Sequence, residues 1–269
     1  MEITNQLVKS VVRLQTDKSL GTGFFFSFAV NDDRFVPAIV TNRHVLKDVS
    51  TLQVVFSAYD SHRHRIHESY QISNVKEAVI FHPDKNTDLA VVPIITLLED
   101  FRNETGIVPE ISYLNHSFLP QPENINKMKT IEDILVVGYP NGLWDMVNNQ
   151  PLVRKGITAS DYKIDFNGEN KFIIDCSIFP GSSGSPVFML IDGMWSDGSG
   201  TIELGKQEVF LLGINSAVYL HQADGKIVEK DIQTVLGTST AVPNNLGIII
   251  KSSELDIFEK ILWERAYGK

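Results

Sequence analysis

The sequence predicts an all-β protein made of two six-stranded antiparallel β-barrels with a C-terminal α-helix. Short runs rich in β-branched and aromatic residues recur along the chain, separated by Gly, Pro, Asn and Asp. The runs form two sets on either side of a polar, proline-containing stretch at residues 99–130. Many short strands with turn residues between them are typical of a sandwich or of barrels rather than of alternating β and α units. Two such sets therefore indicate two barrels.

Each set contains about the number of runs that one barrel needs. The first set comprises residues 7–14, 23–29, 35–41, 52–57, 66–72, 76–81 and 89–94. The second set comprises residues 134–139, 152–157, 171–179, 186–191, 208–218 and 246–251. We therefore expect an N-terminal barrel in residues 1–115 and a C-terminal barrel in residues 116–251.

Helical signals are confined to two segments. Residues 41–49 leave room for a single turn. In residues 252–266, one helical face carries Leu255, Phe258, Ile261 and Leu262. Ser252 or Ser253 can cap the first turn. We expect residues 252–269 to form a helix that packs on a barrel.

Composition limits the class of protein. The 269 residues are 43% hydrophobic and 21% charged, which is typical of globular chains. A net charge of −9 disfavours nucleic acid as a partner. No apolar run approaches the ~20 residues of a membrane span, and the first residues show no secretory signal. Cys176, the one cysteine, excludes an internal disulfide, so we expect a soluble, cytoplasmic protein that binds neither membrane nor nucleic acid.

The strongest chemical signal is Gly-Ser-Ser-Gly-Ser-Pro, which begins at Gly181 and lies between two expected strands. Glycines on both sides of Ser183 allow a tight turn that a ligand can approach closely. In such a turn the amides of Gly181 and Ser183 can point into one hollow and stabilise a developing oxyanion. Taken alone, a turn of this composition is usually only a turn.

Two further residues give the turn a chemical context. His44 follows the apolar run that ends at residue 41, and Asp88 stands at the head of the run at residues 89–94. Each alone is usually a turn or cap residue, but the order His, Asp, Ser places two of them in the first barrel and Ser183 in the second. A site between two barrels is where a cleft is expected.

At this point the chain resembles the trypsin-like (chymotrypsin-fold) serine peptidases, especially the bacterial branch with the high-temperature-requirement proteases and the glutamyl endopeptidases. The resemblance extends from Gly-Thr-Gly-Phe at residues 21–24 to Asn-Leu-Gly-Ile-Ile-Ile at residues 245–250. Val-Val-Gly-Tyr-Pro at residues 136–140 and Leu-Gly-Ile-Asn-Ser at residues 212–216 fit the strands between these ends. Ser182 replaces the aspartate that pairs with a newly cut N-terminus in digestive relatives, so we expect an oxyanion turn that either forms without such processing or is controlled by a partner.

The chemistry of the three residues agrees with the resemblance. A serine hydroxyl is a poor nucleophile until a base removes its proton, and the imidazole of His44 suits that task. Asp88 would fix the tautomer of His44 and stabilise the imidazolium. The expected activity is endopeptidase cleavage of protein or peptide substrates through an acyl-enzyme, with no metal or cofactor. A regulatory protein partner would restrain such an enzyme.

The resemblance also suggests a substrate pocket. It places Ser177 at the pocket floor, where the lack of a carboxylate disfavours cleavage after Lys or Arg. Ser216, Ala217 and Val218 would form the wall and the edge that pairs with extended substrate. Val218 stands where roomy-pocket relatives carry glycine, which favours small or medium apolar residues, whereas His221 favours an acidic residue instead.

Several features have simpler interpretations. His62, His64 and His67 have strand-like spacing, but arginines lie between them and no cysteine is near, so we favour a solvated strand over a metal site. Cys176 is interpreted as an inert buried thiol, and residues 192–200 as a hairpin tip rather than a calcium loop. Two other functions remain open: a catalytically silent barrel that binds peptides or scaffolds a complex, and an esterase that uses the same three residues.

Overall fold

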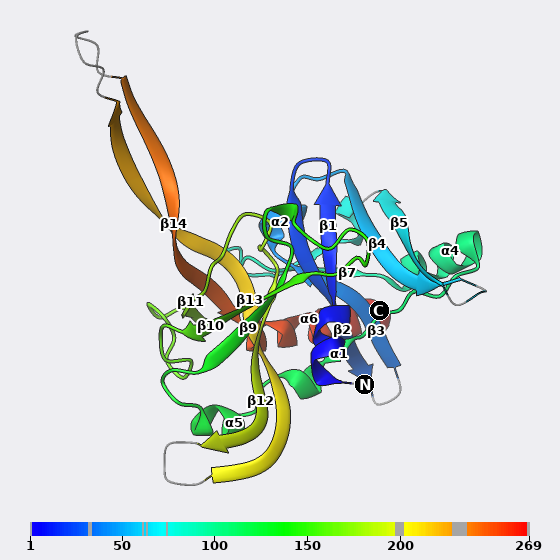
Figure 1. Cartoon of the computed structure of the whole chain (residues 1–269). Coiled ribbons are helices and arrows are strands. Elements are labelled where there is room, and N and C mark those ends of the chain that lie inside the picture. The colour runs from blue at the N-terminus through cyan, green and yellow to red at the C-terminus, as the bar shows by residue number, and fades with distance from the viewer. Residues whose placement is uncertain are drawn as a thin grey trace.

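The computed structural model describes residues 2–31, 34–60, 62, 64–73, 75–196, 202–227 and 236–267. Side chains are described throughout these ranges except at residues 31, 73, 194–196, 202–203, 206, 218–227, 236–244 and 266. Two β-rich halves lie side by side, and a long two-stranded ribbon runs out from the second half (Figure 1). This ribbon belongs to β13 (Ile202–Ile227) and β14 (Leu236–Lys251).

The N-terminal half is one eight-stranded sheet with the order β5-β4-β1-β2-β3-β7-β6, to which β8 adds as a parallel partner of β2. The order is an open path among the described residues, so it differs from the closed six-stranded barrel expected here. The short strands β6 and β8 pair over only two residues each. β6 is the end of the run expected at residues 76–81, the first half of which forms a short helix instead, whereas β8 was not expected because a pairing of two residues leaves no periodic signal in the sequence. The strands are β1 (Val11–Thr16), β2 (Leu20–Asn31), β3 (Arg34–Thr41), β4 (Thr51–Tyr59), β5 (Arg65–Ser73), β6 (Ile80–Phe81), β7 (Ala90–Pro93) and β8 (Leu114–Asn115).

The C-terminal half is a closed barrel of six antiparallel strands in the order β10-β11-β14-β13-β12-β9. The all-β class and the six-stranded C-terminal barrel are therefore confirmed. β13 and β14 continue far beyond the runs expected at residues 208–218 and 246–251 and form the ribbon of Figure 1. The remaining strands are β9 (Asp133–Gly138), β10 (Leu152–Thr158), β11 (Lys171–Asp175) and β12 (Pro186–Ser196).

Helices appear where the pattern predicted strands or a polar linker. The helix α4 (Ile95–Thr105) lies mostly within the expected linker and buries only Leu97 and Phe101, which is too weak an apolar stripe to stand out in a polar segment. It ends at Gly106, whose φ of 70° suits a left-handed C-cap. The single turn expected at residues 41–49 is present as α2 (Arg43–Leu46). The remaining α-helices before the C-terminal one, among the described residues, are α1 (Ile3–Lys9), α3 (Val75–Ala78) and α5 (Pro122–Lys127).

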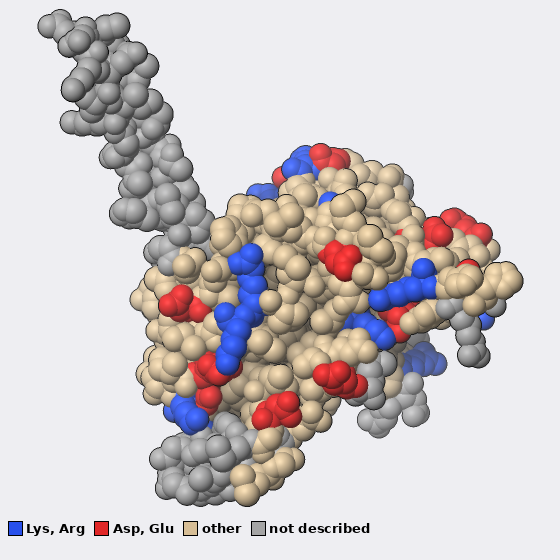
Figure 2. Space-filling view, viewed as in Figure 1, with Lys and Arg blue, Asp and Glu red and all other residues tan. Residues whose placement is uncertain are grey.

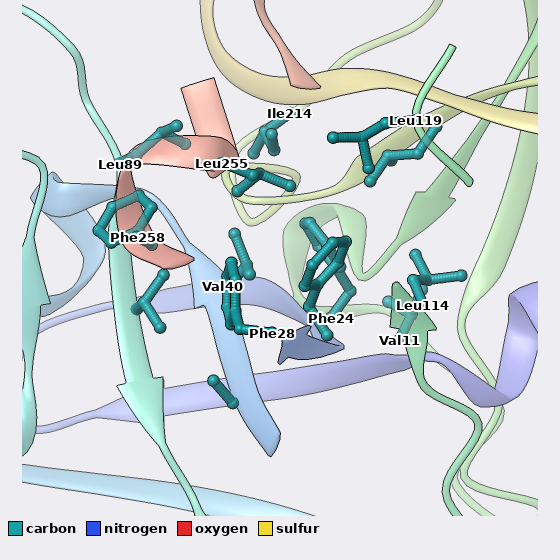
Figure 3. Close-up of a cluster of buried hydrophobic side chains, with 14 of the residues drawn as sticks. Val11, Phe24, Phe28, Val40, Leu89, Leu114, Leu119, Ile214, Leu255 and Phe258 are labelled. Atoms are coloured by element: carbon teal, nitrogen blue, oxygen red, sulfur yellow. The ribbon is translucent and has the colours of Figure 1, made fainter. Parts of the chain in front are cut away.

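The C-terminal helix joins the two halves. It starts as a 3₁₀ turn at Ser252–Leu255 and continues as α6 (Asp256–Tyr267). Phe258 packs on Phe28 of β2, with ring centroids 6.3 Å apart, so the helix covers the first sheet although it follows the second barrel. The same apolar cluster includes Val40 of β3 and Ile214 of β13 (Figure 3). Because this core is continuous between the halves, it fixes the position of one half against the other.

The surface carries charges of both signs. On the face in Figure 2, Lys and Arg side chains form a short row near the middle and several separate groups elsewhere, and Asp and Glu side chains lie between them, so no single sign of charge covers this face. None of the helices in the described part of the chain is long and apolar enough to cross a membrane.

Candidate active site

His44 and Asp88 form a directly hydrogen-bonded pair. His44 lies on α2, immediately after β3, and Asp88 lies just before β7, which pairs with β3. The Nδ1 atom of His44 is 2.6 Å from Oδ2 of Asp88, and the backbone N–H of His44 donates to Oδ1 at 2.9 Å. A carboxylate held at Nδ1 fixes the imidazole ring and its tautomer. The Nε2 atom is then the nitrogen that can accept a proton.

Asp88 is held by groups from both halves of the molecule. The Asn42 side chain and the Arg43 amide donate to the Asp88 carbonyl at 2.9 and 3.3 Å. The Ser216 hydroxyl, on β13, donates to Oδ2 of Asp88 at 2.9 Å. Burial raises the pKa of Asp88. The hydrogen bonds and the charge of His44, together with the hydrogen bond from Ser216, lower this pKa by more than burial raises it, so the pKa of Asp88 lies below its ordinary value. Asp88 is therefore a carboxylate at neutral pH.

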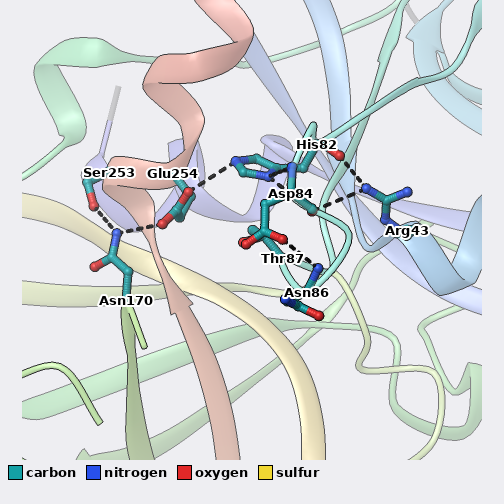
Figure 4. Close-up of polar contacts among 8 residues, drawn as sticks. All are labelled: Arg43, His82, Asp84, Asn86, Thr87, Asn170, Ser253 and Glu254. Atoms are coloured by element: carbon teal, nitrogen blue, oxygen red, sulfur yellow. Dashed lines mark hydrogen bonds and ion pairs between the residues drawn. The ribbon is translucent and has the colours of Figure 1, made fainter. Parts of the chain in front are cut away.

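A polar network supports the turn that carries His44 (Figure 4). Arg43, the neighbour of His44, donates from its guanidinium to the carbonyl of His82. The buried His82 ring lies with Nε2 3.0 Å from the Glu254 carboxylate, which also accepts from the Asn170 side chain at 2.8 Å. These contacts connect the first sheet to the start of the C-terminal helix, and thereby help to fix the position of α2.

Ser183 lies in the turn between β11 and β12. Along this turn, backbone amides that donate a hydrogen bond to a described residue alternate with amides that do not. The amide of Ser182 donates to the Phe179 carbonyl at 3.0 Å, and the amide of Gly184 donates to the Asn215 carbonyl at 2.8 Å. The amides of Gly181 and Ser183 have no acceptor among the described residues. Two unpaired N–H groups, one of them on Ser183 itself, are what an oxyanion site requires.

The conformation of this turn depends on Thr22 and Asn215, whose roles the sequence analysis missed. The buried Thr22, on β2, donates from its amide to the Ser183 carbonyl at 2.9 Å and from its hydroxyl to the Gly181 carbonyl at 2.8 Å. The buried Asn215, on β13, donates from its side chain to the Ser182 carbonyl at 2.9 Å. Three consecutive carbonyls are thereby bound by the scaffold. Thr22 and Asn215 lie within the motifs at residues 21–24 and 212–216 that carry the family resemblance. Their place in these motifs was the only sign in the sequence that they belong to the site.

The Ser183 hydroxyl makes no hydrogen bond to His44 or to any other residue that the structure describes. Ser183 itself is half-buried rather than enclosed. In unliganded enzymes the bond between nucleophile and base is often long and shortens when substrate binds. The structure therefore brings His44 and Asp88 into contact and leaves the hydroxyl of Ser183 unengaged.

Gly184 allows us to test how tightly the turn is fitted. Its φ is +85°, and a Cβ atom here would lie 2.0 Å from the Thr22 carbonyl oxygen and 2.4 Å from the Thr41 hydroxyl. We expect Gly184→Ala to destabilise the fold by more than about 4 kcal/mol, because backbone strain and a steric clash combine. Gly168→Ala is the matched control, since Gly168 has a φ of +76° with nothing within 4 Å of the added Cβ. Thermal unfolding of both variants measures the difference, and equal losses would contradict a close fit at Gly184.

Ser177 and Ser216, two of the residues proposed for the substrate pocket, make hydrogen bonds to different parts of the site. Ser177 follows β11, and its carbonyl accepts from Nη1 of Arg154 at 2.9 Å. The Arg154 guanidinium also lies 4.7 Å from the centroid of the Phe179 ring, so this cation holds the segment at the proposed floor. The hydroxyl of Ser216 is used by Asp88, which gives Ser216 a role that the sequence analysis did not predict.

The edge of β13 is the part of the site that could hold an extended peptide. Pairing of β12 with β13 ends at Ile214, so the residues after it have no β12 partner. Ala217 is exposed on this edge. Val218 pairs with Gly247 of β14, but the side chains of Val218 and His221 lie outside the described side chains, so their expected effects on specificity stay predictions.

The histidines that we interpreted as part of a solvated strand make hydrogen bonds to nearby protein groups. His64 bonds to Asp60, and His67 bonds to the Ser57 hydroxyl and to the Val147 carbonyl. No group of three potential metal ligands is found in the described part of the chain.

Cys176 is buried, as expected, and burial raises the pKa of its thiol, which disfavours the reactive thiolate. The expected hairpin tip at residues 192–200 is only partly visible, because residues 197–201 lie outside the described ranges.

A family model for the trypsin-like peptidase domain matches residues 21–194, more than half of the chain, and this range contains His44, Asp88 and Ser183. The chain belongs to the trypsin-like peptidase family. The family membership predicted from the sequence motifs is therefore confirmed, and with it the class of trypsin-like serine protease. A comparison with curated protein sequences finds no match to this peptidase.

Two solved structures illustrate what the fold of this peptidase is similar to. One is an inactive form of a serine-to-alanine mutant of Rv3671c from M. tuberculosis, with 15% identity, a TM-score of 0.49, and coverage of 99% of this chain and 91% of the other. The other is a scabies mite inactivated protease paralogue, with 12% identity, a TM-score of 0.49, and coverage of 97% of each chain.

Proposed function

We propose that this peptidase is a serine endopeptidase that hydrolyses protein substrates through Ser183, His44 and Asp88. The observation that carries the proposal is the coupling of two neighbouring residues on β13. Asn215 binds the turn that contains Ser183, and Ser216 binds Asp88, which in turn binds His44. All three proposed catalytic residues are thereby attached, directly or through one partner, to a single point of the C-terminal barrel.

The proposed reaction has two stages. The Ser183 hydroxyl attacks the substrate carbonyl while Nε2 of His44 takes its proton, and Asp88 stabilises the resulting imidazolium. The oxyanion is bound by the unpaired amides of Gly181 and Ser183. Collapse of the intermediate breaks the peptide bond, His44 returns the proton to the leaving amine, and an acyl-enzyme remains. Water, deprotonated by His44, then releases the acid and restores Ser183.

Substrate preference is part of the proposal. The segment before the scissile bond would pair with the free edge of β13 from Ser216 to Val218. Ser177 offers no carboxylate at the proposed floor, and the cation of Arg154 bonds to the Ser177 carbonyl. Both features disfavour Lys and Arg. They leave small or medium apolar residues as our first expectation, and Arg154 supports acidic residues as the alternative.

Covalent labelling tests the catalytic proposal directly. A fluorophosphonate should form one adduct, and peptide mapping should place that adduct on Ser183. A peptide library cleaved by the purified protein then reports the residue before the scissile bond. A catalytically silent scaffold would bind peptides without being labelled, whereas an esterase would be labelled and turn over esters but not peptides. A dominant preference for Lys or Arg would contradict the proposed pocket.

A cytoplasmic location and a regulatory protein partner stay predictions. The first is supported by the single, buried Cys176, since secreted domains commonly rely on disulfides. The second is supported by the general hazard of an unrestrained protease.

A further inference from the structure

An open cavity of about 740 Å³ adjoins the turn that carries the unpaired amides. Its lining includes Gly181 and Pro180 of that turn, Asn141 after β9, and Arg13, Lys18 and Leu20 from β1, β2 and the connection between them. Among the side chains that the structure describes, none from β13 lines it. The cavity therefore lies beyond Gly181, away from the β13 edge.

The position of the cavity determines which part of a substrate could reach it, if the proposed function is correct. Residues before the scissile bond would lie along β13, and the scissile carbonyl would face the amides of Gly181 and Ser183. An extended chain that passes this point must continue away from β13, over Gly181 and Pro180. The cavity is consequently on the path of the residues that follow the scissile bond.

The charge of the cavity is positive. Arg13 and Lys18 line it, and no carboxylate from the described part of the chain does. The Arg13 guanidinium is 4.2 Å from the centroid of the Trp144 ring, and its Nη1 donates to the Gln15 side chain at 3.0 Å, so it is positioned by neutral groups. Neither Arg13 nor Lys18 forms an ion pair within the described ranges. Asp17, on the same turn as Lys18, uses Oδ1 to accept from the amide of Ser50 and is not part of the lining.

We propose that this cavity binds acidic side chains in the substrate segment that follows the scissile bond. Arg13 and Lys18 form no ion pair among the described residues, and the charge of Lys18 acts on the neighbouring Asp17 only as one of several causes that lower the pKa of Asp17. Two such cations, next to a mostly neutral wall, complement an Asp or Glu side chain and repel Lys or Arg. The preferred substrates are then proteins with acidic residues shortly after the cleavage site. This inference rests on the proposed function and adds the class of sequence that the leaving-group side accepts.

The acyl-enzyme can react either with water or with an added amine, and the ratio of the two products tests this preference without involving the β13 side. The wild-type protein is acylated with a peptide thiobenzyl ester, and Gly-Asp amide, Gly-Asn amide or Gly-Lys amide is added as the competing nucleophile. We expect the Asp compound to capture the acyl group about five- to tenfold better than the isosteric Asn compound, and the Lys compound to be poorest. The preference should shrink in roughly 0.5 M salt, which screens exposed charges.

Variants assign the preference to the two cations. The ratio of Asp to Asn capture should fall towards one in Lys18→Gln, at the exposed turn, and in Arg13→Gln. Lys260→Gln, an exposed lysine on α6, is the matched control and should keep the wild-type ratio. Equal capture of the Asp and Asn compounds by an enzyme that still hydrolyses the ester would overturn this inference alone. Failure of the ester to acylate Ser183 would overturn the proposed function, and this inference with it.

Discussion

Replacing Ser183 with alanine is expected to lower kcat/KM for peptide cleavage by at least about 10³-fold while the fold stays intact. The variant removes the attacking oxygen but no structural contact, because the Ser183 hydroxyl has no hydrogen bond to any residue that the structure describes. The carbonyl of Ser183, which accepts from Thr22, is retained. Cleavage of the best library peptide and thermal unfolding of the same preparation measure the two effects.

Ser50→Ala is a suitable control, since Ser50 is an exposed serine whose contact with Asp17 uses the backbone amide. It should leave both cleavage and thermal unfolding unchanged. Undiminished turnover by Ser183→Ala would exclude Ser183 as the nucleophile. The same variant, expressed in the host cell, can retain uncleaved substrates and so identify them.

Asp88→Asn is expected to lower kcat by about 10³- to 10⁴-fold near neutral pH. The amide cannot stabilise an imidazolium, and its NH₂ group competes with the Nδ1–H of His44, so the base is held in the wrong tautomer. Ser216→Ala is the graded comparison, because it keeps the carboxylate and removes only the 2.9 Å hydrogen bond to Oδ2. We expect it to lower kcat by roughly tenfold or less. If both variants lowered kcat by a comparable factor, the charge of Asp88 would not be needed, and Asp88 would act only by holding His44 in position.

The lowered pKa of Asp88 also has a consequence for stability against pH. A carboxyl whose pKa is lower in the folded protein than in the unfolded chain stabilises the fold above its ordinary pKa near 4, and this contribution is lost as pH falls through the lowered value. Wild-type protein should therefore be more stable than Asp88→Asn at pH 7, and the difference should begin to shrink near pH 4 and disappear only when the pH lies below the lowered pKa of Asp88. Thermal unfolding of both proteins across this range measures the effect.

Elements with a long apolar pattern were predictable from the sequence, and elements with a short or sparse pattern were not. The six strands of the C-terminal barrel and the C-terminal helix were predictable, because each has an apolar pattern that extends over several residues. The helix α4 was not, because its buried face consists of Leu97 and Phe101 in an otherwise polar segment. The sequence also predicted a closed N-terminal barrel, whereas the described residues form an open path with β5 and β6 at its two ends, and β8, which joins β2 by a pairing of two residues, was not expected. Pairings of two residues depend on contacts that are distant in the sequence.

For the site, the sequence by itself determined the chemistry: a serine between glycines, a histidine and an aspartate, in an order that identifies the family. Only the tertiary structure decided which groups hold them in place. The hydroxyl of Thr22 binds the carbonyl of Gly181 across 159 positions, and Asn215 binds the same turn from the other side. The cavity next to Gly181 likewise combines Arg13 with Pro180. No local pattern encodes such partners, because a hydrogen bond depends on distance in space and not on separation along the chain.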